Sequence, residues 1–431
     1  MRKWRFKMKD YKRDTLCIHA GYEPENGGSR VLPITQSTTF KFDSSEHMAD
    51  LFDLKAAGFF YTRLGNPTLD AVEKKIAALE GGVGALITSS GQAASLLSII
   101  NIAHSGDHVI SSSAIYGGTY NLFYKTIKEM GIDVTFVSPK ISYEDLLKEF
   151  KENTKCVFAE TLTNPSLIVT DIEMFAKAAH VSGVPIIVDN TFPTPMNCRP
   201  IEFGVDIVIH STTKYMDGHA TQVGGVIIDS GNFNWTNGKF PALVEPDDSY
   251  HGTSYVESFG KAAYIVKART HLMRDIGAQA APMNAFLLNL GLETLALRME
   301  RHCSNAQKVA EYLESNDKIS WVNFPGLKSN ENYELAQKYL PNGSCGVVSF
   351  GVVGGREAAT KFMDSLELAS VVTHVADLRT CVLHPASTTH RQLSDTQLLE
   401  AGVSADLIRF SVGIENADDI IADIEAALSK I

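Results

Sequence analysis

Seven short apolar runs, separated by segments with helical periodicity, dominate residues 71–229. The runs lie at 85–90, 108–113, 133–138, 156–161, 185–190, 206–211 and 224–229. Strands that are apolar on both faces are typical of a parallel sheet that helices cover on both sides. The sequence therefore predicts an α/β fold with a mostly parallel, seven-stranded sheet and helices on both of its faces.

The rest of the chain divides around this sheet. Residues 1–70 are irregular and punctuated by proline and glycine, which predicts an N-terminal arm. The sheet and its helices are assigned to a domain over 71–275. Residues 294–315 have the periodicity of a long amphipathic helix, which opens a smaller C-terminal α+β domain over 276–431. Residues 231–255 are rich in Gly, Pro, Asn and Asp and predict a long loop, of a kind that is usually functional or mobile.

The composition argues against several classes of function. The net charge of −11 argues against a nucleic-acid or acidic-membrane partner, and no apolar run approaches the ~20 residues that span a bilayer. No two of the cysteines have C-x-x-C spacing, which argues against a metal site or a disulfide scaffold and favours a reducing, cytoplasmic compartment. The basic start has no apolar stretch after it and is not a secretory signal; if Met8 is the true initiator, residues 1–7 are an upstream extension.

Polar and aromatic residues follow two of the predicted strands at the edge where parallel sheets bind ligands. Residues 89–92, Ser-Ser-Gly-Gln, open a helix, where free N–H groups could hold an anion, although a plain N-cap is an equally good interpretation. Tyr116 lies beside two glycines, either as a core aromatic residue or as a ring that stacks on a flat ligand. The glycines at 81–86 lack the third glycine of a dinucleotide fingerprint, which argues against an NAD site.

Two charged residues follow further strands. Asp189 comes directly after four apolar residues, so its carboxylate belongs either to a structural ion pair or to a site that holds a ligand cation. Lys214 follows the run at 206–211 among three hydroxyl side chains. Alone, such a lysine is most often a surface residue, but burial at a strand end would lower its pKa and make the amine a nucleophile.

These strand-end residues together meet the requirements of pyridoxal 5'-phosphate. Lys214 can bond covalently to the cofactor aldehyde, and Asp189 can keep the pyridine nitrogen protonated so that the ring withdraws electrons. Ser211 and Thr213 can donate hydroxyl hydrogen bonds to the phosphate, which explains why hydroxyl groups surround the lysine. A different class of function stays open: a nucleotide- or phosphate-binding module with no covalent cofactor.

Longer motifs resemble the cystathionine γ-synthase/methionine γ-lyase family, the pyridoxal-phosphate enzymes of Cys/Met metabolism. They are FYTRLGNPT (60–68), SSGQAA (89–94), YGGTYNL (116–122), ETLTNPS (160–166), VDNTF (188–192), HSTTKY (210–215), HPAS (384–387) and RFSVGIE (409–415). The resemblance runs from about residue 14 to the end of the chain, and the motifs are specific as a set. It implies the fold of a type I PLP-dependent transferase.

The resemblance also implies a role for each matching residue. Lys214 carries the cofactor and moves protons, Asp189 pairs with the pyridine nitrogen, and Tyr116 stacks on the ring and assists as an acid or base. Arg409 binds the substrate α-carboxylate, and Asn164 contacts the ring oxygen of the cofactor. The residues implied for the cofactor phosphate are Gly91, Gln92, Ser211, Thr213 and, from the arm of a neighbouring subunit, Tyr61 and Arg63.

Within the family the chain is most similar to the O-acetylhomoserine sulfhydrylases. The similar segments are VLPITQSTTF (31–40), NFNWTNGKFP (232–241), EPDDSYHG (245–252) and HPASTTHRQL (384–393). The similarity implies a γ-replacement in which O-acetyl-L-homoserine and sulfide (or methanethiol) give L-homocysteine (or L-methionine) and acetate, a step of methionine biosynthesis. It also implies a homotetramer built as a dimer of dimers.

Two positions depart from the wider family. Gly118 stands where the γ-lyases carry a cysteine, which argues against an enzyme that only eliminates. His374 stands where relatives often have a small polar residue; it either lines the substrate pocket or is an ordinary loop histidine. Cystathionine γ-synthase or γ-lyase chemistry on the same scaffold is the alternative to sulfhydrylation.

Overall fold

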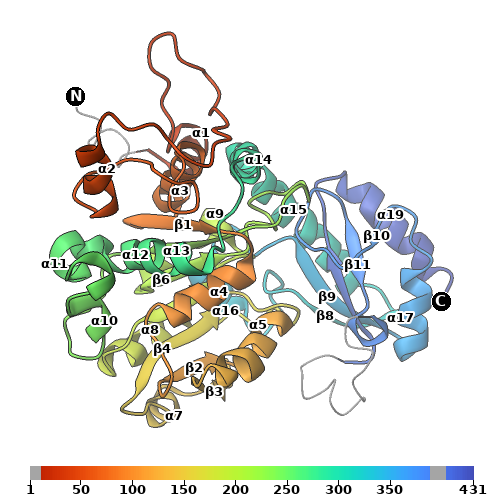
Figure 1. Cartoon of the computed structure of the whole chain (residues 1–431). Coiled ribbons are helices and arrows are strands. Elements are labelled where there is room, and N and C mark those ends of the chain that lie inside the picture. Colours follow the sequence, from red (N-terminus) through yellow and green to blue (C-terminus); the bar gives the residue numbers. More distant parts are fainter. Residues whose placement is uncertain (1–10, 389–403) are drawn as a thin grey trace.

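A seven-stranded sheet forms the centre of the larger part of the molecule (Figure 1). The computed structural model describes residues 11–388 and 404–431. The strands are β1 (Gly84–Thr88), β2 (His108–Ser112), β3 (Asp133–Val137), β4 (Thr154–Glu160), β5 (Ile186–Asp189), β6 (Ile207–His210) and β7 (Gly225–Asp229), in the order β1-β7-β6-β5-β4-β2-β3. All pairs are parallel except those of β7 with β1 and β6. Each predicted apolar run forms one of these strands, which confirms the mostly parallel sheet.

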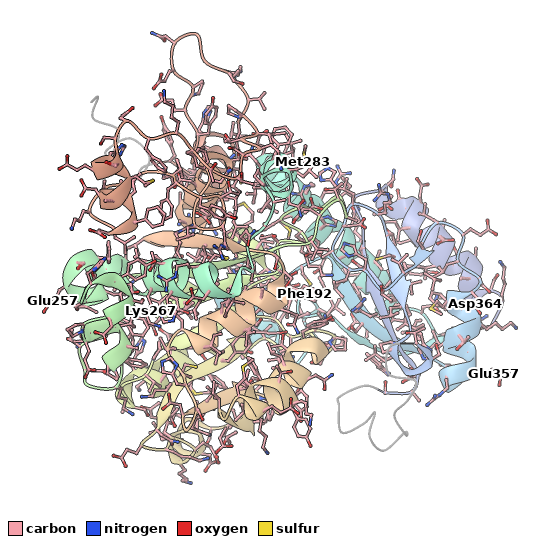
Figure 2. All side chains as sticks on the ribbon, in the orientation of Figure 1. Phe192, Glu257, Lys267, Met283, Glu357 and Asp364 are labelled. Atoms are coloured by element: carbon pink, nitrogen blue, oxygen red, sulfur yellow. The ribbon has the colours of Figure 1, made fainter. Side chains whose placement is uncertain are left out.

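A second, smaller sheet lies in the C-terminal part of the chain. Its strands are β8 (Ile319–Asn323), β9 (Val347–Val352), β10 (Ser370–Val371), β11 (Cys381–Leu383) and β12 (Leu407–Ser411), in the order β10-β11-β12-β9-β8. The predicted long helix is α15 (Leu295–Glu314), which packs on this sheet with α17 (Gly355–Met363) and α19 (Ala417–Leu428). In Figure 2, Phe192 lies between the two sheets and Glu357 lies on the outer helix α17. The predicted C-terminal α+β unit is therefore present.

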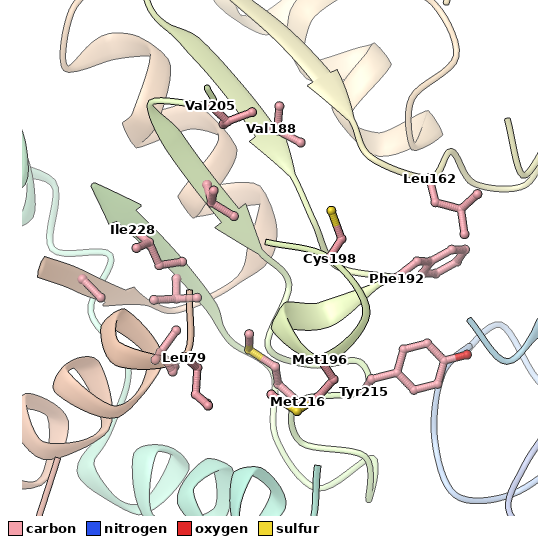
Figure 3. Packing of buried hydrophobic residues seen from close by; sticks show 14 of the residues in the cluster. Leu79, Leu162, Val188, Phe192, Met196, Cys198, Val205, Tyr215, Met216 and Ile228 are labelled. Carbon is pink, nitrogen blue, oxygen red and sulfur yellow. The ribbon is translucent and has the colours of Figure 1, made fainter. Parts of the chain in front are cut away.

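Both faces of the large sheet are buried, as the doubly apolar runs predict. In β5, Ile186 and Val188 join one hydrophobic cluster, whereas Ile187 between them joins the cluster on the opposite face. Successive side chains of a strand point to opposite faces, so an apolar residue at every position requires cover on both sides. Figure 3 shows part of the first cluster, which includes Val188 of β5, Ile228 of β7 and Val205.

Helices before, between and after the strands provide this cover. Residues of α3 (Pro67–Glu80) and α8 (Ile172–Val181) belong to one cluster, and residues of α4 (Gly91–Ile100) and α12 (Ala263–Lys267) belong to the other. Among the described residues, the remaining α-helices are α1 (Arg13–His19), α2 (Ser45–Phe52), α5 (Gly117–Asn121), α6 (Ile127–Glu129), α7 (Tyr143–Lys148), α9 (Thr194–Asn197), α10 (Pro241–Val244), α11 (Tyr255–Phe259), α13 (Arg274–Ile276), α14 (Pro282–Glu293) and α16 (Tyr333–Tyr339).

The N-terminal region is only partly an extended arm. Helix α1 packs against α3, α14 and α15, and its Leu16 and Cys17 are buried in the first cluster. The domain boundaries at residues 70 and 275 stay predictions. The predictions for residues 1–8, and for the part of the motif at 384–393 that follows Thr388, lie outside the described residues. Over the described ranges, no helix is both long and apolar enough to cross a bilayer.

The segment at 231–255 differs from the predicted long loop. It contains α10 and a short 3-10 helix at Asp248–Tyr250, and Trp235 stacks on Tyr264 with ring centroids 5.3 Å apart. Asn237 donates to the Gly183 carbonyl at 2.9 Å, just before β5 begins. Buried aromatic side chains therefore attach this segment to the amino ends of the strands, opposite the edge where ligands bind in parallel sheets.

Candidate active site

A cavity of about 270 Å³ opens at the carboxyl ends of β4, β5 and β6, between the large sheet and the C-terminal sheet. Every predicted site residue lines this cavity except Tyr61 and Arg63. The predicted residues in its wall are Gly91, Gln92, Tyr116, Asn164, Asp189, Ser211, Thr213, Lys214 and Arg409. The parallel sheet explains most of this convergence, since the carboxyl ends of parallel strands share one edge.

The amino end of α4 forms an anion cradle in the cavity wall. The Ser90 side chain caps the helix by accepting from the Ala93 N–H at 3.1 Å, which leaves the N–H groups of Gly91 and Gln92 as donors. A Cβ atom on Gly91 would lie 2.7 Å from Cβ of Ser211, so only glycine lets the helix approach the residues after β6 this closely. The cradle thus combines helix N–H groups with the Ser211 hydroxyl.

Thr213 is more constrained than Ser211. Its Oγ1 lies 3.1 Å from both the carbonyl oxygen and the N–H nitrogen of Gly224, and donates to the first and accepts from the second. The hydroxyl proton of Thr213 is therefore already used within the protein. Of the two predicted phosphate donors on this turn, Ser211 has the freer hydroxyl.

Asp189 is held in place by Thr191. The N–H and hydroxyl groups of Thr191 both donate to Oδ1 of Asp189, at 2.9 and 2.5 Å, and the Thr191 hydroxyl also accepts from the Ser211 N–H at 2.8 Å. Burial raises the pKa of Asp189, and the hydrogen bonds from Thr191 oppose this shift. One carboxylate oxygen is thus committed to the protein, and the other can face a cationic group in the cavity.

Lys214 has the environment of a reactive amine. Burial, and secondarily the positive charge of Arg409, lower its pKa to about 8. Among the described residues it forms no ion pair. A lysine in this state is partly neutral near pH 8 and can act as a nucleophile or a base.

The Tyr116 ring lies at the rim of the cavity. Its side chain is 50% exposed, and a Cβ atom on Gly118 would lie only 2.5 Å from its Cε1 atom and 3.1 Å from Nε2 of Gln92. Glycine at 118 therefore lets the ring pack closely against the turn that opens α5. A cysteine at this position would have to displace the ring.

Arg409 brings a buried cation into the cavity from β12. Its side chain donates to the carbonyl oxygens of Thr373 and His374 at 3.2 and 3.3 Å and lies 3.5 Å from Oδ1 of Asn164. Its Nε atom is buried without a partner, and the residue is only 8% exposed. It makes no ion pair with a carboxylate of the described chain. Because burying an unpaired charge is costly, this guanidinium fits an anionic ligand.

His374 contributes its backbone to the site. Its carbonyl oxygen accepts from Arg409, and its neighbours Thr373 and Val375 line the cavity, whereas the imidazole does not. Burial, and then the charge of Lys214, lower the pKa of His374. The sequence left two readings of this histidine open, and the structure favours a loop residue that helps to hold Arg409.

Tyr61 and Arg63 do not reach the cavity of their own chain. Arg63 donates to the Arg274 carbonyl at 2.7 Å, and its guanidinium lies over the Tyr61 ring at 5.2 Å. Tyr61 is 40% exposed. Within one chain, therefore, neither residue contacts the groups predicted to bind the phosphate.

The donor set of the cavity fits pyridoxal 5'-phosphate. The cradle at α4 suits the phosphate, the free oxygen of Asp189 suits a protonated pyridine nitrogen, and the Lys214 amine suits an aldehyde. All three groups lie in the wall of one cavity. Where the described chain is concerned, no three His, Cys, Asp or Glu side chains are grouped so as to hold a metal ion.

Comparison with known proteins decides the family. A family model described as Cys/Met metabolism PLP-dependent enzyme matches residues 14–429. This chain belongs to that family. The predicted family and its cofactor, pyridoxal 5'-phosphate, are confirmed. The role of each individual residue toward the cofactor stays a prediction.

Members of the PLP-dependent family match the chain over nearly its full length. The O-acetyl-L-homoserine sulfhydrylase of Leptospira meyeri is 47% identical over 98% of both chains. The homocysteine synthase of Schizosaccharomyces pombe is 47% identical over 96% of this chain and 97% of its own. A crystal structure from Campylobacter jejuni, assigned as an O-acetylhomoserine (thiol)-lyase with N'-pyridoxyl-lysine-5'-monophosphate, has a TM-score of 0.93 at 38% identity and covers 97% of this chain and 100% of that one. The type I fold is thereby confirmed.

Thr191 and Glu160 are among the cavity residues that were not predicted from the sequence, and each contacts a predicted site residue. Both belong to motifs that carried the family resemblance, VDNTF and ETLTNPS. Glu160 is a charged residue directly after apolar strand residues, just as Asp189 is, and the same argument applied to β4 would have found it. Thr191 carries no comparable signal, because a threonine two residues after an aspartate is common in turns.

Proposed function

We propose that the chain is an O-acetylhomoserine sulfhydrylase. It converts O-acetyl-L-homoserine and sulfide, or methanethiol, to L-homocysteine, or L-methionine, and acetate. The observation that carries this proposal is the buried, carboxylate-free guanidinium of Arg409 in the same cavity as Lys214. This guanidinium supports a substrate with a carboxylate, such as an amino acid. The names of the full-length relatives indicate which amino acid it is, O-acetylhomoserine.

The residues of the chain divide the work of a γ-replacement. Arg409 orients the substrate by its α-carboxylate, and the Thr373 and His374 carbonyls hold the guanidinium in place. Bound pyridoxal 5'-phosphate supplies an electron sink for negative charge at the substrate α-carbon. Thr191 fixes Oδ1 of Asp189. The other carboxylate oxygen of Asp189 is therefore available to stabilise a proton on the ring nitrogen.

Proton movement falls to Lys214 and Tyr116. The neutral Lys214 amine takes the α-proton and later returns it, and the Tyr116 hydroxyl is a further acid in the cavity wall. The C–O bond at the γ-carbon breaks and releases acetate. A C–S bond to hydrosulfide forms at the same carbon: hydrosulfide brings the electron pair of the new bond and keeps its proton, and acetate leaves with the electron pair of the broken C–O bond. Sulfide is small, so the C-terminal sheet needs to leave only a narrow path to this carbon.

An acceptor comparison tests the proposed reaction. The purified enzyme with pyridoxal 5'-phosphate and O-acetylhomoserine is supplied in turn with sulfide, methanethiol and cysteine. Homocysteine formation from sulfide is expected to have a kcat/KM at least about tenfold above cystathionine formation from cysteine, because the small nucleophile loses less freedom on binding. A preference for cysteine would assign cystathionine γ-synthase chemistry, and ammonia release without any acceptor would assign a γ-lyase.

We also propose a dimer of dimers in which Tyr61 and Arg63 serve the cavity of a neighbouring subunit. The basis is their position: neither reaches the cavity of its own chain, although both belong to a motif of the family. Mixing two inactive variants tests this arrangement. A heterodimer of Lys214→Ala and Arg63→Ala chains contains one intact site, so random reassociation is expected to restore about a quarter of the wild-type activity. No recovery would place Arg63 in its own subunit's site.

We propose a reducing, cytoplasmic location. The basis is the state of the cysteines: all of them are free and buried, and none pairs with another. Secreted proteins of oxidising compartments more often use cysteines as disulfides.

A further inference from the structure

Glu160 is a second carboxyl group in the wall of the cavity. It ends β4, where the parallel register pairs it directly with Asp189 at the end of β5. Paired residues of neighbouring strands point to the same face of a sheet, so both carboxyl groups face the cavity. Glu160 is only 4% exposed.

The two oxygens of Glu160 hold two separate loops. Oε1 accepts from the Tyr116 N–H at 2.6 Å, and Oε2 accepts from the Asn164 N–H at 3.2 Å. The first loop follows β2, and the second follows β4. These loops carry the ring predicted to stack on the cofactor and the amide predicted to contact its ring oxygen.

A buried carboxyl group at position 160 is expected to lower the stability of the fold. Burial, and then the nearby charge of Asp189, raise the pKa of Glu160 well above its usual value. It has no cationic partner among the described residues. An apolar side chain would avoid this cost, and glutamine would offer only one acceptor oxygen. The feature that a carboxyl group adds is a pair of acceptors, which matches the two N–H groups.

We propose that Glu160 is a positioning residue whose two oxygens hold Tyr116 and Asn164 in the places from which they meet the cofactor. Glu160 acts through these two loops, and the inference rests on the proposed pyridoxal-phosphate chemistry. Replacing one oxygen by an amide nitrogen would set a donor against a backbone donor and release one loop.

Glu160→Gln tests this role, with Asp206→Asn as the matched control. Asp206 is also a buried carboxylate that accepts a strand N–H, from Ile186 at 2.9 Å, but it lies at the opposite end of the strands. Measured quantities are the pyridoxal 5'-phosphate dissociation constant, the wavelength of the visible band, kcat and KM, and the thermal midpoint without cofactor. Glu160→Gln is expected to weaken cofactor binding about tenfold and to shift the band. Asp206→Asn is expected to lower only the thermal midpoint.

An unchanged band and cofactor affinity in Glu160→Gln would make Glu160 purely structural and overturn the inference. If this variant does not fold, Glu160→Ala, which removes both acceptors without adding a donor, takes its place, and wild-type affinity and band there would overturn the inference equally. Glu160→Asp keeps both acceptors on a shorter side chain and is expected to bind cofactor more tightly than Glu160→Gln; the reverse order would contradict the two-acceptor argument. A wild-type chain without a visible band would contradict the proposed function instead.

Discussion

Replacing Lys214 with alanine is expected to lower kcat by about 10³-fold or more and to abolish covalent attachment of pyridoxal 5'-phosphate. The reason is that Lys214 is the one lysine that the described residues place in the cavity wall, and a pKa of about 8 suits both of its predicted roles, as the nucleophile for the aldehyde and the base for the α-proton. Steady-state turnover of O-acetylhomoserine measures the first effect. Mass spectrometry after borohydride reduction measures the second.

Lys267→Ala is the matched control for this variant. Lys267 is 3% exposed, burial lowers its pKa to about 8, and its Nζ donates to the Asn101 carbonyl at 2.8 Å. Figure 2 shows it on α12, away from Phe192 in the cavity wall. It is expected to lose stability but to keep cofactor attachment and turnover per folded molecule. If the cofactor still attaches covalently to Lys214→Ala, another amine carries it, and the assignment of Lys214 is wrong.

Replacing Asp189 with asparagine is expected to lower kcat by about 10²- to 10⁴-fold, because breaking a buried charge pair costs about 3–5 kcal/mol. Thr191 donates twice to Oδ1, so the amide oxygen of asparagine would keep that place and the amide NH₂ would face the cavity. A donor would then face the ring nitrogen where a carboxylate had stabilised its protonated form. Turnover and the visible band of the loaded enzyme measure the change.

Asp229→Asn controls for the loss of a buried carboxylate. Asp229 is 1% exposed and accepts from the Gly231 N–H at 2.8 Å, and it ends β7 at the edge of the sheet opposite the cavity. Turnover per folded molecule is expected to be unchanged in this variant. Full activity in Asp189→Asn would point to Glu160, its neighbour in the register, as the partner of the ring nitrogen.

Much of the fold follows from local pattern. A run such as 185–190 is apolar at consecutive positions, and only a strand covered on both faces buries all of them. The segment at 231–255 shows where this reasoning fails. Its Gly, Pro, Asn and Asp content predicts turns correctly, but it says nothing about Trp235, which packs on the core and draws the segment against the amino ends of the strands.

Some residues of the candidate site could be placed from the sequence, and others could not. Asp189 and Lys214 could be placed together from sequence because each follows a strand, and parallel strands end at one edge. The roles of His374 and Glu160 could not, because each depends on which backbone groups lie within hydrogen-bond reach. Such contacts join segments that no periodicity relates.

The sequence by itself determined the sheet, the edge at which a ligand is expected, and the lysine and carboxylate that are predicted to face a cofactor there. These features follow from the alternation of side chains along a strand and from the common direction of parallel strands. The family resemblance implied that Arg409 binds the substrate and that Arg63 serves a neighbouring subunit, but only the tertiary structure gave the approach of Arg409 from the second sheet to Asn164, 245 residues away, and the contact of Arg63 with the Arg274 carbonyl. The physical reason is that these positions depend on how separate segments pack, and packing distances are not encoded by any local spacing of residue types.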